Sequence, residues 1–192
     1  MVTTARHAND TLGAAAACPH DGRYSWACWR ADLRENRSEI SKVALAVYRA
    51  GHALWARRAA GRNPLWVLYK VIDLLLVKLL IGADLPASAC VGPGLILQHG
   101  GKGVMLNENV VIGADVELFH EVTVGWKEVR DRHREHPVPS IGDGVVVGAG
   151  AKVLGDITIG NGAIVGANAV VLRDVPPGAV VAGVPASVVR QS

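Results

Sequence analysis

The chain has 192 residues, a length that suits one domain with at most a helical appendage and excludes a multidomain assembly. Half of the residues are hydrophobic, only 5% are aromatic and 22 are glycine, so the interior must be built from small aliphatic side chains on a backbone that bends often. Residues 1–84 carry 12 basic and 7 acidic side chains, and residues 85–192 carry 8 and 10. Neither part shows the clustered basic face of a nucleic-acid-binding protein.

The first 23 residues are small and polar, a composition that predicts disorder. They lack a positively charged start followed by an apolar core, which argues against a signal peptide. The cysteines at 18, 28 and 90 form no CxxC pair. The sequence therefore favours reduced cysteines and a cytoplasmic location.

Residues 24–83 are predicted to be helical. Apolar residues recur at helical steps over 38–59. The stretch 64–82 is the most apolar in the chain, but three charged residues interrupt it and it is short for a membrane span. We expect a buried amphipathic helix there, with a helix lying at a membrane surface as the alternative.

The composition changes at about Asp84, since four of the five tryptophans precede it and 17 of the 22 glycines follow it. From there on, aliphatic residues repeat at six-residue steps, a period that indicates a solenoid. A nine-residue step and a seventeen-residue step divide the repeat into three registers. The repeated residues are Leu85, Val91 and Leu97, then Leu106, Ile112, Leu118 and Val124, then Ile141, Val147, Val153, Ile159, Val165 and Val171.

Each hexad is interpreted as one short flat side of a coil and its corner, with the aliphatic residue pointing inward and a glycine closing the corner. Three sides make one coil of eighteen residues, although the period does not fix the handedness. If the nine-residue step is one side plus a three-residue bulge, His99 and His120 lie on the same face of adjacent coils. Their imidazole rings are then predicted to lie about 4.8 Å apart, one strand spacing.

Several motifs carry a resemblance to a known family. They are YRAGHALW at 48–55, DL at 84–85, GPGLILQHG at 92–100, the run that begins HPVPSIGDG at 136, and VPA at 184–186. Together with the hexads they resemble the hexapeptide-repeat acyltransferases, and among these the serine O-acetyltransferases and their short relatives. The resemblance implies a left-handed parallel β-helix over 84–192, interrupted by a loop at 125–140 and preceded by a short helical region.

The resemblance also implies transfer of an acetyl group from acetyl-CoA directly to the hydroxyl of L-serine or a similar small amino acid. An alcohol is too weak an acid to attack unaided at neutral pH, so this reaction needs a base. By resemblance, His99 is the base and Asp84 orients its ring. A backbone N–H near Gly125 or Trp126 would polarise the thioester oxygen.

Acceptor binding is assigned by the same resemblance. Arg132 and His133, in the motif DRH, would hold the acceptor's carboxylate and assist at the reacting centre, and His136 competes with His133 for this role. The family usually has Asp where this chain has Gln98. The remaining acceptor-side candidates are Gln98, His120 and Asp32.

CoA is expected to lie along the outside of the coils. Ala149 and Ala167, eighteen residues apart, match the family's small contact positions, and Lys152 is a candidate partner for a CoA phosphate. The resemblance implies a homotrimer with its site between neighbouring chains, a place in cysteine biosynthesis and no metal. A complex with the sulfhydrylase that forms cysteine, a nucleic-acid partner and a membrane span are not expected.

Three alternatives stay open at this point. One is an O-acetyltransferase that acts on a sugar or natural-product hydroxyl, because Gln98 lacks the charge that would bind an amino group. Another is a metalloenzyme similar to the γ-type carbonic anhydrases, with zinc held by His99, His120 and either His133 or His136. The last is a non-catalytic solenoid.

Overall fold

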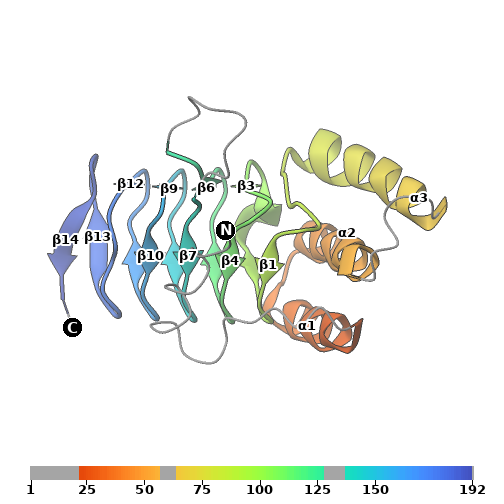
Figure 1. Ribbon diagram of the computed structural model, residues 1–192, viewed down its shortest axis with the longest axis horizontal. Coiled ribbons are helices and arrows are strands. Elements are labelled where there is room, and N and C mark those ends of the chain that lie inside the picture. The colour runs from red at the N-terminus through yellow and green to blue at the C-terminus, as the bar shows by residue number, and fades with distance from the viewer. Residues whose placement is uncertain (1–21, 57–63, 128–136, 192) are drawn as a thin grey trace, which may run out of the picture.

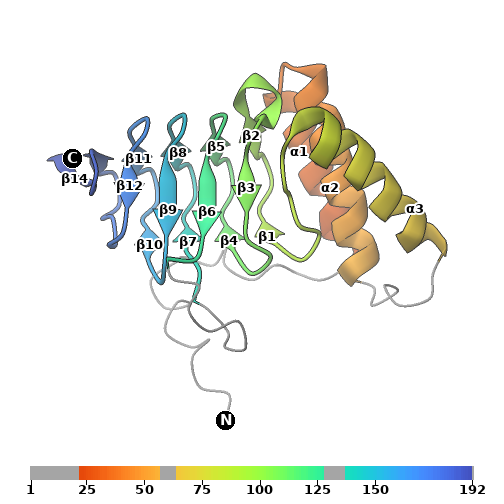
Figure 2. The same ribbon diagram turned by 90° about the horizontal axis from the view of Figure 1, so that it is seen from above.

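The structure is a computed structural model that describes residues 22–56, 64–127 and 137–191. Helices form one end of the molecule, and a stack of short strands extends from them to the C-terminus (Figure 1). The strands form a three-sided prism, which Figure 2 shows from above.

Each coil of the prism contributes one strand to each of three sheets, and pairing between consecutive coils is parallel. The first sheet holds β1 (Cys90–Val91), β4 (Val111–Ile112), β7 (Ser140–Ile141) and β10 (Thr158–Ile159). The second holds β2 (Ile96–Leu97), β5 (Glu117–Leu118), β8 (Val146–Val147), β11 (Ile164–Val165), β13 (Val180–Ala182) and the antiparallel β14 (Ser187–Arg190). The third holds β3 (Met105–Leu106), β6 (Thr123–Gly125), β9 (Lys152–Leu154) and β12 (Val170–Val171).

The aliphatic hexad residues point into the prism, as predicted, and none of them is more than 6% exposed. The residue two positions earlier in most hexads also points inward, for example Val116 before Leu118, because side chains alternate along a strand. Neighbouring coils approach closely at the corners. A Cβ on Gly113 would lie 2.8 Å from the backbone nitrogen of Asp143, so the repeated glycine is required by contact between coils.

Helices α1 (Gly22–Glu35) and α2 (Glu39–Ala56) pack against the first coil, with polar side chains directed at its open edge. Carbonyl groups there have no preceding coil to pair with, and buried carbonyls need donors. The donors come from the helices and the segment between them: Asn36 to Leu95, Ser41 to Leu97, Tyr48 to Ala89, and Arg49 to Val91 and Gly92, at 2.6–2.7 Å.

The predicted helix over 64–82 is present as α3 (Pro64–Ile72) continued by the π-helical segment η1 (Asp73–Ile81). It ends at Gly82, whose φ of 75° suits glycine at a helix C-terminus. The expectation that this helix is buried is wrong for the single chain, since Leu79 is 69% and Leu80 is 77% exposed. One stripe of the helix is buried, and it includes Tyr69, Asp73 and Val77.

Cys28 is buried, whereas Cys90 is disulfide-bonded. The expectation of reduced cysteines is therefore wrong at Cys90, because the absence of a CxxC motif does not exclude a disulfide. None of the described helices is long and apolar enough to cross a bilayer.

Candidate active site

Two histidines meet on adjacent coils. Leu97 of β2 pairs with Leu118 of β5, and the rings that follow, His99 and His120, have centroids 4.9 Å apart at an interplanar angle of 87°. This distance confirms the predicted spacing of one strand. The three extra residues of this coil enlarge the corner that contains the four-residue segment η2 (Gln98–Gly101), where His99 itself has a φ of 53°. The strained corner places His99 on the surface.

The second ring is enclosed more than the first. His120 is half-buried, and its Nδ1 is buried without a hydrogen-bond partner among the residues that the structure describes. A buried polar atom without a partner is uncommon in native proteins and points to a functional site. His120 therefore presents an unsatisfied ring nitrogen next to the exposed ring of His99.

Two neighbours of the histidines were not predicted from the sequence. The Phe119 ring lies 6.3 Å from that of His99 between centroids. The Gln98 amide donates from Nε2 to Oε1 of Glu117 at 2.6 Å. The hexad repeat places Glu117 opposite Ile96 on the adjacent coil, two residues before Gln98. The sequence repeat could therefore have indicated that Glu117 lies near Gln98.

Three of the predicted CoA residues, Ala149, Ala167 and Lys152, lie on the same edge of the prism as the histidines. Backbone hydrogen bonds link the corners in order, from the Gly150 N–H to the His120 carbonyl at 3.0 Å and from the Asn168 N–H to the Ala149 carbonyl at 2.8 Å. Ala149 and Ala167 thus stack directly beyond His120. At the start of the adjoining strand, the Lys152 ammonium donates to the Glu121 carbonyl at 2.6 Å.

Asp84 borders this edge but does not bond to His99. Its backbone pairs with Met105, the first residue of the strand that follows η2. Its carboxylate Oδ1 lies 2.9 Å from Lys78 Nζ in a pair whose side chains are 40% and 39% exposed. In the described chain Asp84 therefore forms an exposed ion pair with Lys78 in place of the predicted contact with His99.

Asp32 serves the fold in this structure. Its carboxylate is 1% exposed and accepts hydrogen bonds from Arg49 Nε at 2.8 Å, from Arg49 Nη2 at 3.1 Å and from the Leu95 N–H at 3.0 Å. Burial opposes the charge of Arg49, but the bonds to Asp32 outweigh it and hold the pKa of Arg49 above its ordinary value. Both carboxylate oxygens are occupied, so the predicted contact with an acceptor is not available to Asp32.

Gly125 and Trp126 lie at a different edge of the prism. Gly125 ends β6, on the side of the third sheet that is remote from η2. In Figure 2, η2 lies at the upper edge beside β2, while the chain leaves β6 at the lower edge. One chain therefore does not bring these residues together with His99. The loop candidates Arg132, His133 and His136 lie outside the described residues.

The metal alternative depended on a cluster of histidines. Within 22–56, 64–127 and 137–191, no group of three His, Cys, Asp or Glu side chains is arranged to hold a metal ion. His99 and His120 would supply two of the three nitrogen ligands of this alternative, and its third ligand, His133 or His136, lies outside the described residues.

Comparison with known proteins identifies similar sequences. Residues 139–173 match the family model described as bacterial transferase hexapeptide (six repeats). The serine acetyltransferase of Mycobacterium tuberculosis is 38% identical over 174 residues, which cover 85% of this chain and 72% of that protein. The serine acetyltransferase of Escherichia coli is 40% identical over 148 residues, which cover 76% of this chain but only 50% of that protein.

Solved structures share the fold. The soybean serine acetyltransferase apoenzyme superimposes with a TM-score of 0.69 at 33% identity, covering 87% of this chain and 68% of that one. A serine acetyltransferase in complex with CoA gives a TM-score of 0.68 at 29% identity, covering 86% and 68%. Together with the three parallel sheets, these matches confirm the predicted left-handed parallel β-helix preceded by a helical region.

Proposed function

Because the chain belongs to the serine acetyltransferase family of hexapeptide-repeat transferases, we propose that it transfers the acetyl group of acetyl-CoA to the hydroxyl of L-serine or a similar small amino acid. The observation that carries this proposal is the pair of imidazoles, His99 and His120, on an edge that continues into the stacked alanines Ala149 and Ala167. A hydroxyl acceptor requires a base to remove its proton. The pantetheine arm of CoA requires small residues along which it can approach the backbone. A cytoplasmic location is proposed with it, since acetyl-CoA is available there.

In the proposed reaction, His99 removes the proton of the acceptor hydroxyl as the oxygen attacks the thioester carbonyl. The tetrahedral intermediate collapses by breaking the carbon–sulfur bond. The CoA thiolate leaves and takes the proton back from the imidazolium, so the ring is neutral again. His120 is proposed to position the His99 ring by edge contact. An imidazole base suffices for this chemistry, and no metal is assigned a role.

Asp84 is proposed to stabilise the His99 imidazolium during turnover. Its present partner, Lys78, forms an exposed ion pair with it, and pairs of this kind contribute only about 0–1 kcal/mol. Asp84 could therefore leave Lys78 and pair with the charged imidazole of His99 at a small cost in free energy. Replacement of Asp84 by Asn would test this role through the pH dependence of turnover.

A homotrimer is proposed because one chain leaves the site incomplete. The thioester oxygen would be polarised by a backbone N–H near Gly125 or Trp126 of a neighbouring copy. The acceptor's carboxylate would be held by Arg132 with His133 or His136, and a CoA phosphate by Lys152. These assignments follow the family resemblance and the position of Gly125 on an edge remote from η2.

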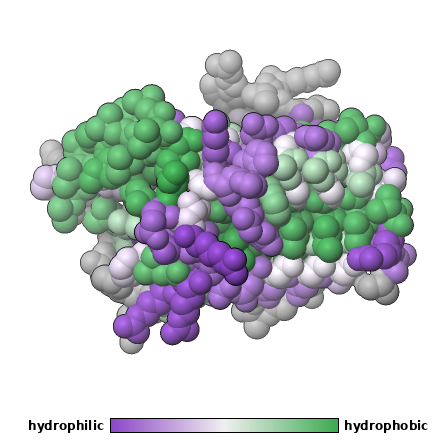
Figure 3. Space-filling view, turned by 180° about the vertical axis from the view of Figure 1, so that it is seen from behind, coloured by the Kyte–Doolittle hydropathy of each residue, from purple (hydrophilic) through white to green (hydrophobic). Residues whose placement is uncertain are grey.

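The surface supports self-association. Ten large apolar side chains of α3 and η1 are more than a third exposed, and large exposed apolar patches mark contacts with other proteins. Seen from behind, this apolar area and a second one over the strands lie on the same face, with a polar band between them (Figure 3). We expect a second copy of the chain to cover this apolar surface, because another copy would also complete the active site.

The test is release of CoA thiol from acetyl-CoA by purified protein, with L-serine, L-homoserine and representative sugars as acceptors. Release with L-serine at ordinary enzyme rates supports the proposal. Release only with a sugar would support the proposed mechanism but show that the acceptor is not an amino acid. A sugar acceptor is the main alternative because the side chain of Gln98 carries no charge to bind an amino group. No release with any of these acceptors would contradict the proposal.

A further inference from the structure

Glu117 is a lone carboxylate in an apolar row. The first residue of each strand in the second sheet points outward, and parallel pairing aligns these residues across the coils. The aligned residues are Ile96, Glu117, Val146, Ile164 and Val180. A charged group set among apolar side chains loses hydration, so its presence in this row calls for a functional reason.

The contacts of Glu117 fix its position without neutralising its charge. Oε1 accepts a hydrogen bond from Gln98 Nε2 at 2.6 Å, and an amide carries no charge. Among the described side chains, no Lys, Arg or His forms an ion pair with Glu117. A carboxylate accepts about four hydrogen bonds, so Oε2 and the remaining lone pairs of Oε1 are able to bind a further donor.

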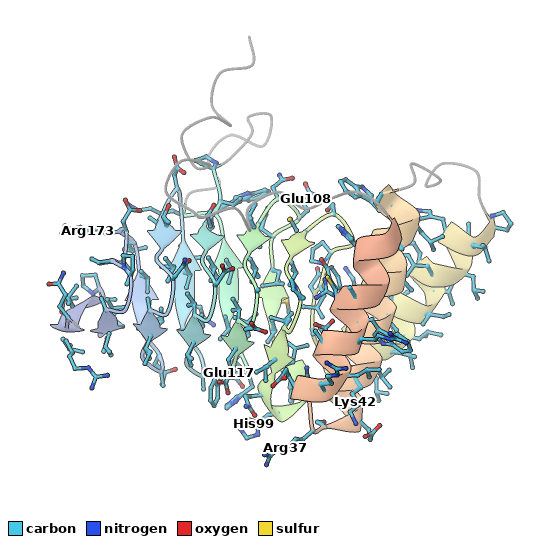
Figure 4. All side chains as sticks on the ribbon, turned by 90° about the horizontal axis from the view of Figure 1, so that it is seen from below. Arg37, Lys42, His99, Glu108, Glu117 and Arg173 are labelled. Atoms are coloured by element: carbon cyan, nitrogen blue, oxygen red, sulfur yellow. The ribbon has the colours of Figure 1, made fainter. Side chains whose placement is uncertain are left out.

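This carboxylate lies beside the proposed base. Gln98 directly precedes His99 in η2, and Glu117 lies on the coil that also carries His120. Figure 4 shows Glu117 and His99 close together at the lower margin of the molecule. Glu117 is half-buried, so one side of the carboxylate remains accessible from the surface on which a hydroxyl would approach His99.

We propose that Glu117, held in place by Gln98, binds a protonated amine of the acceptor while His99 acts on the hydroxyl of the same molecule. An unpaired carboxylate in apolar surroundings attracts a cation more strongly than one in water, and a charge-assisted hydrogen bond is about twice as strong as a neutral one. The preferred acceptor is therefore an amino alcohol such as a hydroxy amino acid, and a neutral sugar is disfavoured. This inference rests on the proposed acetyl transfer.

The experiment compares Glu117→Gln with the wild-type chain on two acceptors, L-serine and L-glycerate, which carries a hydroxyl in place of the amine. Glutamine keeps the shape and removes the charge. The KM for L-serine is expected to rise about 10- to 100-fold, the value of one charge-assisted hydrogen bond, while the KM values for L-glycerate and acetyl-CoA stay within about threefold. The control is Glu108→Gln, an exposed glutamate in the turn after β3 (Figure 4), which is expected to change none of these values.

Two further readouts separate the outcomes. If the enzyme acetylates L-serine and Glu117→Gln does not alter its KM, the inference is overturned although the proposed function stands. Calorimetry measures L-serine binding without turnover. Binding that Glu117→Gln weakens supports the inference even if no acetyl transfer follows, whereas absence of binding to the wild-type chain overturns it. The wild-type preference for L-serine over L-glycerate needs no variant, and a ratio near one also overturns the inference.

Discussion

The rings of His99 and His120 meet edge to face, with 4.9 Å between their centroids, and the exposed ring belongs to the proposed base. We predict that His99→Ala lowers kcat by about 10²- to 10⁴-fold, the usual contribution of a general base, with an unchanged circular dichroism spectrum. His120→Ala should lower kcat by less, because His120 acts through the orientation of its neighbour. Steady-state thiol release measures both, and a larger loss in His120→Ala would transfer the role of base to that residue.

The buried pair of Asp32 and Arg49 joins the helices to the first coil. Removal of one member leaves the other as an uncompensated buried charge, so Arg49→Ala should lower the free energy of unfolding by about 3–5 kcal/mol. Glu39→Ala, which removes an exposed ion pair with Lys42, should cost less than about 1 kcal/mol. Urea denaturation followed by circular dichroism makes the comparison. Similar losses in the two variants would mean that the buried pair does not stabilise the fold.

Contact between coils at Gly113 predicts a strong effect of one added methyl group. The new Cβ would lie 2.8 Å from the Asp143 nitrogen and displace the carboxylate that accepts from the Ala114 N–H at 2.7 Å. Gly113→Ala is therefore expected to cost about 2–3 kcal/mol, in the range for overpacking. Gly144→Ala is the matched control. Its φ is 63°, and a Cβ added there would meet nothing within 4 Å, so only backbone strain of about 1 kcal/mol is expected. Thermal melts should rank the two variants in this order.

Burial raises the pKa of Asp73, while Lys78 and Lys70 oppose the shift and Asp84 adds to it. A raised pKa in the folded state means that the folded chain holds this proton more tightly than the unfolded chain does. Stability is therefore lost as the pH rises through the raised pKa and regained as it falls toward the ordinary value of 3.8. Asp73→Asn should melt at a higher temperature than the wild-type chain at pH 7.5, and the difference should shrink near pH 4. A difference independent of pH would contradict this assignment.

The exposed leucines at the end of η1 predict the effect of polar substitution on assembly. Because Leu79 and Leu80 are 69% and 77% exposed in one chain, replacing both with Ser removes apolar surface from the proposed trimer contact and little from the fold. Sedimentation equilibrium should show a mass near one chain for the double variant and near three chains for the wild type. Val189→Ser changes a residue of β14 that is 62% exposed and should leave the trimer intact. A wild-type mass of one chain would exclude the shared site.

The repeat allowed the coils to be predicted because each inward residue, such as Leu118, is set by local periodicity. The same register predicted the meeting of His99 and His120. The pairing of Asp32 with Arg49, and the exposure of Leu80, depend on how helices dock onto the first coil, which no period encodes. Glu117 was overlooked for a related reason: its importance comes from the apolar row around it, which only the aligned strands bring together.

Both ends of the strand stack are closed. At one end the helical side chains of Tyr48 and Arg49 donate to carbonyls of the first coil, and at the other the antiparallel β14 pairs with β13. A solenoid with bare ends would present strands on which another molecule could continue the ladder, and such edges promote aggregation into fibres. Deleting α1 and α2 would therefore do more than shorten the protein, because it would turn a closed stack into a template for end-to-end polymerisation.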